Sequence, residues 1–247
     1  MGETALSCEN LFYDLDGFEL FDGLSFKLEI GQAGLLLAEP QLRSRRLLQI
    51  CATLRNPVRG EVSWFGRCGG PFGDIQRLDL RRRLAYVHRE ARLVSNMTIL
   101  DNIVLGLIYH RNISHKAAED HVSGLLQRFG LYKFRHRRPA EVSYHVQRQA
   151  VYLRELTKKP SLFLLEVPAV DLDQDFDLMM EVINETVTRK EAALLLSDLS
   201  GGRVLEMVDW VLVMRESGHA LQSADEFDQA QYARFLDECR RTWEEKD

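Results

Sequence analysis

Four short, almost wholly apolar runs are the feature of this sequence that most restricts its fold. They are residues 34–38 (GLLLA), 162–165 (LFLL), 192–196 (AALLL) and 211–214 (VLVM). Runs of this length and composition are typical of strands that are buried on both faces, as the strands of parallel sheets are. Helical patterns separate the runs, so the sequence predicts an α/β fold with a mostly parallel core sheet.

The remaining segments predict two additions to this core. Residues 18–30 alternate over short stretches and indicate antiparallel strands, whereas residues 97–158 show helical spacing. Residues 219–247 are polar and charged, which favours an exposed helix at the end of the chain. We expect one domain over residues 1–247, with a core and β subdomain at about 1–95 and 159–220, a helical subdomain at about 96–158 and a C-terminal helical tail at 221–247.

Charge and cysteine content argue against several classes of protein. The chain has 32 Lys and Arg against 37 Asp and Glu, a net charge of −5, so we expect no nucleic-acid partner. Its apolar runs are far shorter than the roughly 18 residues that span a bilayer. No Cys-x-x-Cys pair occurs, which indicates reduced thiols rather than a zinc site or a disulfide framework.

The loop after the first apolar run has the position of a phosphate-binding loop but not its residues. A buried strand that leads directly into a helix directs the first backbone N–H groups of the helix toward one point, which favours phosphate. Residues 38–46 (AEPQLRSRR) contain neither the glycines nor the lysine that such a loop needs. Either Arg43, Arg45 and Arg46 hold an anion, or they form a solvated basic helix start. Bulky side chains that crowd the backbone favour the second interpretation.

Ordered landmarks along most of the chain resemble one known family. Residues 55–62 (RNPVRGEV), 96–103 (NMTILDNI) and 160–173 (PSLFLLEVPAVDLD) are similar to the family segments RPTSGEV, NLTVxEN and PDLLLLDEPTSGLD. From about residue 6 to about residue 220, the chain resembles the nucleotide-binding domain of an ATP-binding cassette (ABC) transporter. The resemblance implies a P-loop NTPase-like ABC ATPase fold, with a mostly parallel core sheet, an antiparallel β subdomain and a helical subdomain.

The resemblance also implies where nucleotide would be bound. Counted back from Gly60, Arg43 replaces a glycine of the Walker A motif and Ser44 replaces its lysine. Arg45 replaces the hydroxyl that binds Mg²⁺, and Arg46 follows it. Tyr13 falls where the family often stacks an aromatic ring on adenine, with ordinary packing at a strand end as the alternative. These residues and Ser143, which is retained from the signature motif LSGGQ, are the cofactor-binding candidates.

The catalytic positions of the family are changed throughout. Arg89 replaces the Q-loop glutamine, and Val167 replaces the glutamate that activates water, although valine cannot accept a proton. Leu199 lies in the segment where the switch histidine belongs. Glu166 replaces the Walker B aspartate and is the one candidate metal ligand, being a carboxylate one methylene longer. In the signature motif, Tyr144 and His145 stand where the family has two glycines.

These changes predict a catalytically degenerate ABC ATPase-like subunit, a pseudo-ATPase with a structural or regulatory role. No cofactor is expected to be required. By resemblance, its partners are the transmembrane permease of an ABC transporter, received in a groove near Arg89, and a second cassette in a homodimer or heterodimer. The location implied is cytoplasmic and peripheral, on the inner face of the cell membrane, and the substrate class suggested is lipid.

Three alternatives remain open at this point. The first is an active ATPase that binds ATP and Mg²⁺ through an arginine-rich loop and Glu166. The second is a soluble ABC-like regulator without a permease. The third is a nucleotide sensor without hydrolysis, which rests on Tyr13 alone.

Overall fold

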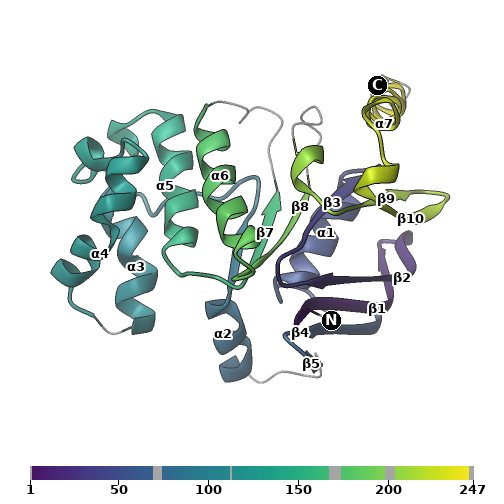
Figure 1. Ribbon diagram of the computed structural model, residues 1–247, viewed down its shortest axis with the longest axis horizontal. Coiled ribbons are helices and arrows are strands. Elements are labelled where there is room, and N and C mark those ends of the chain that lie inside the picture. Colours follow the sequence, from purple (N-terminus) through teal and green to yellow (C-terminus); the bar gives the residue numbers. More distant parts are fainter. Residues whose placement is uncertain (1, 69–73, 112, 167–173, 198–203, 245–247) are drawn as a thin grey trace.

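An antiparallel sheet forms one end of the molecule (Figure 1). The computed structural model describes residues 2–68, 74–111, 113–166, 174–197 and 204–244. The strand order of this sheet is β2-β1-β4-β5. The strands are β1 (Thr4–Leu15), β2 (Phe18–Glu29), β4 (Arg59–Trp64) and β5 (Arg67–Cys68). The antiparallel strands predicted over residues 18–30 are confirmed, because β2 pairs with β1.

The second sheet has the order β10-β9-β3-β8-β7-β6 and lies at the centre of the molecule (Figure 1). Its strands are β3 (Ala33–Ala38), β6 (Leu84–Val87), β7 (Leu162–Glu166), β8 (Ala193–Ser197), β9 (Trp210–Arg215) and β10 (Gly218–Ser223). All its neighbouring pairs are parallel except β9 and β10. The four apolar runs are therefore β3, β7, β8 and β9, and the predicted parallel core is confirmed.

Helices cover this sheet and extend from it. They are α1 (Leu42–Cys51), α2 (Asp74–Arg82), α3 (Ile99–Arg111), α4 (His115–Arg128), α5 (Tyr144–Leu156), α6 (Gln174–Thr188) and α7 (Gln229–Glu244). Helices α3, α4 and α5 gather at the end of the molecule opposite the antiparallel sheet (Figure 1). No helix within the described ranges is long and apolar enough to cross a membrane. The proposed division into core, helical subdomain and tail stays a prediction.

Alternation along the parallel strands creates two hydrophobic cores. In β3, Leu35 and Leu37 belong to the core beneath the helical region and α6. Leu36 and Ala38 belong to the core shared with α1 and the antiparallel sheet. The other parallel strands divide in the same way because successive side chains of a strand point to opposite faces. This parity determines which polar residues at the strand ends can face α1.

The C-terminal helix differs from the prediction of an exposed helix. Tyr232, Phe235 and Cys239 of α7 are all buried, and Glu238 forms an ion pair with Arg215 of β9 at 2.9 Å. Burial, followed by the nearby Glu39 carboxylate, raises the pKa of the Cys239 thiol to about 12. The prediction was based on the overall polarity of the segment. It overlooked an apolar stripe with spacings of three and four residues, which is the pattern of a packed helix.

Candidate functional site

The site is built around the start of α1, at the carboxyl ends of the parallel strands. Helix α1 follows β3 after residues 39–41 and begins without a side-chain cap, since Gln41 has helical backbone angles. No acidic residue stands in its first turn, where Arg43, Arg45 and Arg46 lie instead. Cations at this end oppose the helix dipole, so the structure must satisfy their charges elsewhere.

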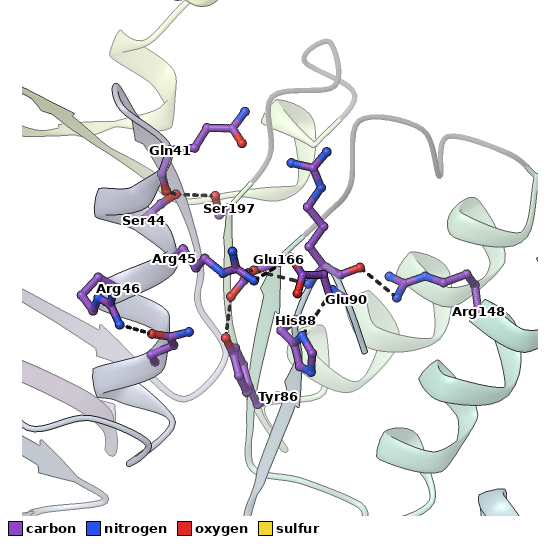
Figure 2. A network of polar contacts seen from close by, with 12 residues as sticks. Gln41, Ser44, Arg45, Arg46, Tyr86, His88, Glu90, Arg148, Glu166 and Ser197 are labelled. Atoms are coloured by element: carbon purple, nitrogen blue, oxygen red, sulfur yellow. Dashed lines mark hydrogen bonds and ion pairs between the residues drawn. The ribbon is translucent and has the colours of Figure 1, made fainter. Parts of the chain in front are cut away.

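Arg45 is held by two carboxylates (Figure 2). Its Nη2 lies 3.1 Å from Oε1 of Glu90, and its Nε lies 3.7 Å from Oε2 of Glu166. Glu166 is almost fully buried and also accepts hydrogen bonds from the Tyr86 hydroxyl and from the backbone N–H of Arg89. The charge of the buried Glu166 carboxylate is thus balanced by a guanidinium group of the chain itself.

Strand parity explains why these groups meet. Glu166 ends β7 two residues after Leu164, which faces α1. Tyr86 of β6 pairs with Leu164, and Ser197 at the end of β8 pairs with Glu166. The parallel register therefore brings one polar side chain from each of three adjacent strands to the face that packs against α1.

Ser44 forms a second contact between α1 and the sheet. Its hydroxyl donates to the backbone carbonyl of Gln41 at 3.0 Å and accepts from the Ser197 hydroxyl at 2.9 Å (Figure 2). The position that the resemblance assigns to the phosphate-binding lysine is therefore occupied by a buried hydroxyl with two hydrogen-bond partners, one in its own turn and one on β8.

The other two arginines of α1 point to internal partners. Nη1 of Arg43 donates to the Leu20 carbonyl of β2 at 2.5 Å. Nη1 of Arg46 donates to Oε1 of Gln49 at 2.8 Å, and its guanidinium lies over the Tyr13 ring, 5.6 Å from the centroid. Both arginines are more than nine-tenths buried. Together with Arg45, they are directed to three separate sets of partners rather than to one anion.

Tyr13 and Ser143 are placed by their own elements. Tyr13 is 8% exposed in β1, with its ring centroid 6.2 Å from that of Phe21. Its exposed face is small, and Arg46 lies against the ring. Ser143 is the N-cap of α5 and accepts a hydrogen bond from the Val146 N–H at 3.4 Å. Val167 and Leu199 lie outside the described residues.

The donor set around Glu166 does not fit a divalent cation. Mg²⁺ prefers an octahedron of oxygen ligands, commonly carboxylates, phosphates and water. Here one carboxylate already accepts hydrogen bonds from a hydroxyl and an N–H group and forms an ion pair with a guanidinium, and the adjacent carboxylate of Glu90 is paired with the same guanidinium. Within the described residues, no cluster of three or more His, Cys, Asp or Glu side chains is placed to hold a metal ion.

Sequence reasoning missed Tyr86 and Glu90. Tyr86 stands in the short run LAYV and reads as a core residue, although its hydroxyl reaches Glu166. Burial, followed by the hydrogen bond and charge of Glu166, raises the pKa of Tyr86 well above its usual value. The available signal was the alternation of side chains along the strand next to β7, which places this tyrosine on the same face of the sheet as Glu166. Glu90, next to Arg89, carried no comparable signal.

A helix that follows a central parallel strand after a short turn, flanked by an antiparallel sheet and a helical region, is the arrangement found in the fold of ABC ATPase cassettes. A solved structure described as "Dimeric Structure of MJ0796, a Bacterial ABC Transporter Cassette" has this fold, with a TM-score of 0.79 at 16% identity over 89% of this chain and 98% of that one. The predicted fold class is therefore confirmed.

Comparison of sequences gives the family. The family model described as "ABC transporter" matches residues 46–170. The lipoprotein-releasing system ATP-binding protein LolD of Hydrogenovibrio crunogenus is 30% identical over 172 residues, which is 67% of this chain and 74% of that protein. The cell division ATP-binding protein FtsE of Haemophilus influenzae is 28% identical over 162 residues, 63% of this chain and 71% of that protein. This chain belongs to the ABC transporter ATP-binding family.

Proposed function

We propose that this chain is a non-hydrolysing cassette subunit of an ABC transporter. The observation that carries the proposal is the contact of Arg45 with Glu166 and Glu90. By the resemblance to the family, Arg45 stands at the position of the Mg²⁺-binding hydroxyl and Glu166 at that of the Walker B carboxylate. A tethered cation therefore lies against the carboxylate that would otherwise orient the metal.

The lost interactions are those on which phosphoryl transfer depends. Hydrolysis of ATP relies on positioning and on neutralisation of charge at the transferred phosphoryl group by Lys, Mg²⁺ and oriented water. Removal of one such interaction commonly costs about a factor of a thousand in rate. The effects need not add, but here the lysine, the metal-binding hydroxyl and the catalytic glutamate are replaced together. The remaining role is structural or regulatory.

The proposal also says with which other subunits this chain assembles. The LolD relative belongs by name to a lipoprotein-releasing system, and the MJ0796 cassette is described as dimeric. We infer that this chain assembles with a second cassette, identical or different, and with a membrane permease whose cargo is a lipid or lipoprotein. It would then lie at the inner face of the cell membrane.

ATP binding by the purified chain tests the proposal. A site filled at a hundredfold over its Kd would stabilise the fold by about 2.7 kcal/mol, so thermal unfolding with millimolar ATP and Mg²⁺ is a sensitive measurement. We expect no shift and no phosphate release from the native chain. The triple variant Arg43→Gly, Ser44→Lys, Arg45→Ser restores a family-like loop and is the matched positive control.

The second candidate function, an active ATPase, predicts the opposite results. Mg²⁺-dependent phosphate release by the native chain, abolished by Glu166→Gln, would establish that activity and overturn the proposal. A thermal shift with ATP but without phosphate release would instead identify a nucleotide sensor.

A further inference from the structure

A pocket of about 220 Å³ lies between α7 and the hairpin of β9 and β10. These elements gather at the end of the molecule that is far from the helical region (Figure 1). The pocket shares no lining residue with the candidate site at the start of α1. Its volume is below the range of about 300–1,000 Å³ that is typical of pockets for drug-sized ligands, so it suits a smaller molecule.

Alternation along the hairpin forms one wall of the pocket. Val213 and Arg215 are two residues apart on β9, so both point to the same face of the sheet. Ala220, which pairs with Val213, and Gln222 continue this face on β10. Val213 and Phe227, which lies between β10 and α7, are both buried. This wall is therefore apolar in part, and Arg215 and Gln222 add polar groups to it.

Helix α7 forms the opposite wall. Gln231, Arg234 and Glu238 have spacings of three and four residues, so they form one stripe along the helix. This stripe borders the buried stripe that packs on the sheet, which consists of Tyr232, Phe235 and Cys239. The helix therefore presents polar side chains to the pocket, while its apolar side chains hold it on the sheet.

Arg215 is held by a partner from the helix wall. Its Nε and Nη2 lie 3.1 and 2.9 Å from Oε2 of Glu238. Its guanidinium also lies over the Phe235 ring, 5.2 Å from the centroid. These contacts connect the two walls, so the pocket is formed by the chain itself, and the charges of Arg215 and Glu238 balance each other.

Arg234 gives the pocket a positive charge that no side chain balances. Its Nε donates to the backbone carbonyl of Ala230 at 3.3 Å, within α7. Arg234 forms no ion pair in the part of the chain that the structure describes. Because Arg215 and Glu238 are paired, the lining residues carry a net charge of +1, which complements a ligand of charge −1.

Two glutamine side chains add hydrogen-bond donors to the pocket. Oε1 of Gln231 accepts from the Asp228 N–H at 2.8 Å, so the NH₂ group of Gln231 is left as a donor. Gln222 forms no side-chain hydrogen bond with other described residues, and its amide also carries an NH₂ group. An ionised carboxylate offers acceptors only, and it therefore suits these donors and the Arg234 guanidinium.

We propose that this pocket binds a small organic carboxylate of charge −1 that carries a short apolar group. The carboxylate lies against Arg234 and the NH₂ group of Gln231, and the apolar group lies against Val213 and Phe227. Inorganic phosphate would leave these two apolar side chains uncovered. The inference goes beyond the proposed function and does not depend on it, because the site lies apart from the start of α1.

Binding of four small probes to the full chain tests the proposal. Isovalerate carries both groups, isovaleramide lacks the charge, acetate lacks the apolar group, and inorganic phosphate is the anion control. Ligand-observed NMR titration measures each Kd. One ion pair with an exposed arginine predicts that isovalerate binds about fivefold more tightly than isovaleramide at low salt. Partial burial of three additional carbon atoms predicts about tenfold tighter binding of isovalerate than of acetate.

Two variants with matched controls locate the binding. Arg234→Gln removes the unbalanced charge and should abolish the preference for isovalerate over isovaleramide, whereas Arg241→Gln on the same helix lies outside the pocket and should keep it. Ala220→Leu fills part of the pocket from the exposed hairpin and should weaken isovalerate binding about tenfold, whereas Ala233→Leu makes the same change outside it. Thermal unfolding without ligand checks that each variant is folded.

The results that would overturn the proposal are distinct from those that concern ATP. Equal affinity for isovalerate and isovaleramide, or an equal effect of a variant and its matched control, would contradict a carboxylate site in this pocket. Phosphate binding as tight as that of isovalerate would assign the pocket to inorganic anions and also overturn the proposal. None of these results changes the expected absence of ATP hydrolysis.

Discussion

Helices α1 and α5 begin at the two places where an ABC cassette would meet nucleotide, yet their first turns are stabilised differently. Before α5, Ser143 has extended backbone angles, and its hydroxyl accepts from the Val146 N–H. Before α1, Gln41 has helical angles and supplies no cap, and the arginines of the first turn add positive charge to the positive end of the helix dipole.

The difference shows how each helix start is maintained. The start of α5 depends on a contact within four residues, whereas that of α1 depends on distant partners, namely Leu20 of β2, Glu90 and Glu166 of β7. A local defect is tolerated when tertiary contacts compensate for it. Removal of the distant partners of α1 should therefore lower the free energy of unfolding much more than removal of the N-cap of α5.

The largest effect is expected from Glu166→Ala. The substitution leaves the Tyr86 hydroxyl, the Arg89 N–H and part of the Arg45 charge without their buried acceptor. Breaking a buried pair on one side costs several kcal/mol, but Arg45 is 38% exposed, so we expect a loss of about 3 kcal/mol in the free energy of unfolding. Urea denaturation measures the loss, with the exposed Glu216→Ala as control.

A double-mutant cycle isolates the ion pair from the other contacts of Glu166. Arg45→Met combined with Glu166→Gln should give a coupling energy of about 1 kcal/mol, because the guanidinium is partly exposed to solvent. Additive single effects would mean that Arg45 contributes to α1 by packing alone. The comparison between a locally and a distantly stabilised helix would then fail.

The pH dependence of stability is the next largest effect. The raised pKa of Tyr86 means that the unfolded chain loses the phenolic proton near pH 10, while the folded chain retains it. The stabilisation is complete below pH 10 and decreases above it by at most about 1.4 kcal/mol per pH unit, because the Tyr86 side chain is partly exposed to solvent. Unfolding at pH 9 to 11 should show that Tyr86→Phe removes this part of the slope. The Cys239 contribution is present in both proteins and cancels in the comparison.

The fold could be predicted from the sequence because strands that are buried on both faces consist almost entirely of apolar residues. The runs at β3, β7, β8 and β9 are apolar at nearly every position, and this pattern is typical of strands that are buried on both faces in a parallel sheet. The prediction for helix α7 was less accurate. Its buried Tyr232 and Phe235 are few among many charged residues, so average polarity outweighed the periodic signal.

The candidate site was predictable in its positions but not in its contacts. Spacing identified Arg45 and Glu166 separately, each as a replaced family residue. Their meeting depends on the register of β7 against β6 and β8 and on the turn between β3 and α1, which no local pattern encodes. Tyr86 was missed for the same reason, since a tyrosine in a short apolar run has the same composition whether or not its hydroxyl is used.

A smaller effect is expected at the other helix. Ser143→Ala removes the side-chain acceptor for the Val146 N–H and should lower the free energy of unfolding by about 1 kcal/mol, the usual cost of losing an N-cap. Thermal or urea unfolding measures it, with the exposed Ser217→Ala as control. A loss as large as that of Glu166→Ala would show that α5 also depends on contacts beyond its own first turn.

The smallest effect is a gain, and it tests whether the positive start of α1 is fully compensated. Gln41→Asp places a carboxylate before the arginines of the first turn and should stabilise the fold by about 0.5 kcal/mol at low salt, the size of a typical charge effect at a helix end. The helical backbone angles of Gln41 do not suit a side-chain cap, so the uncharged control Gln41→Asn should give no gain. An equal gain from both variants would identify capping rather than charge as the missing interaction. A gain confined to Gln41→Asp that disappears at high salt would show that the distant carboxylates leave part of the positive charge unbalanced, and that α1 keeps the electrostatics of an anion-binding helix start.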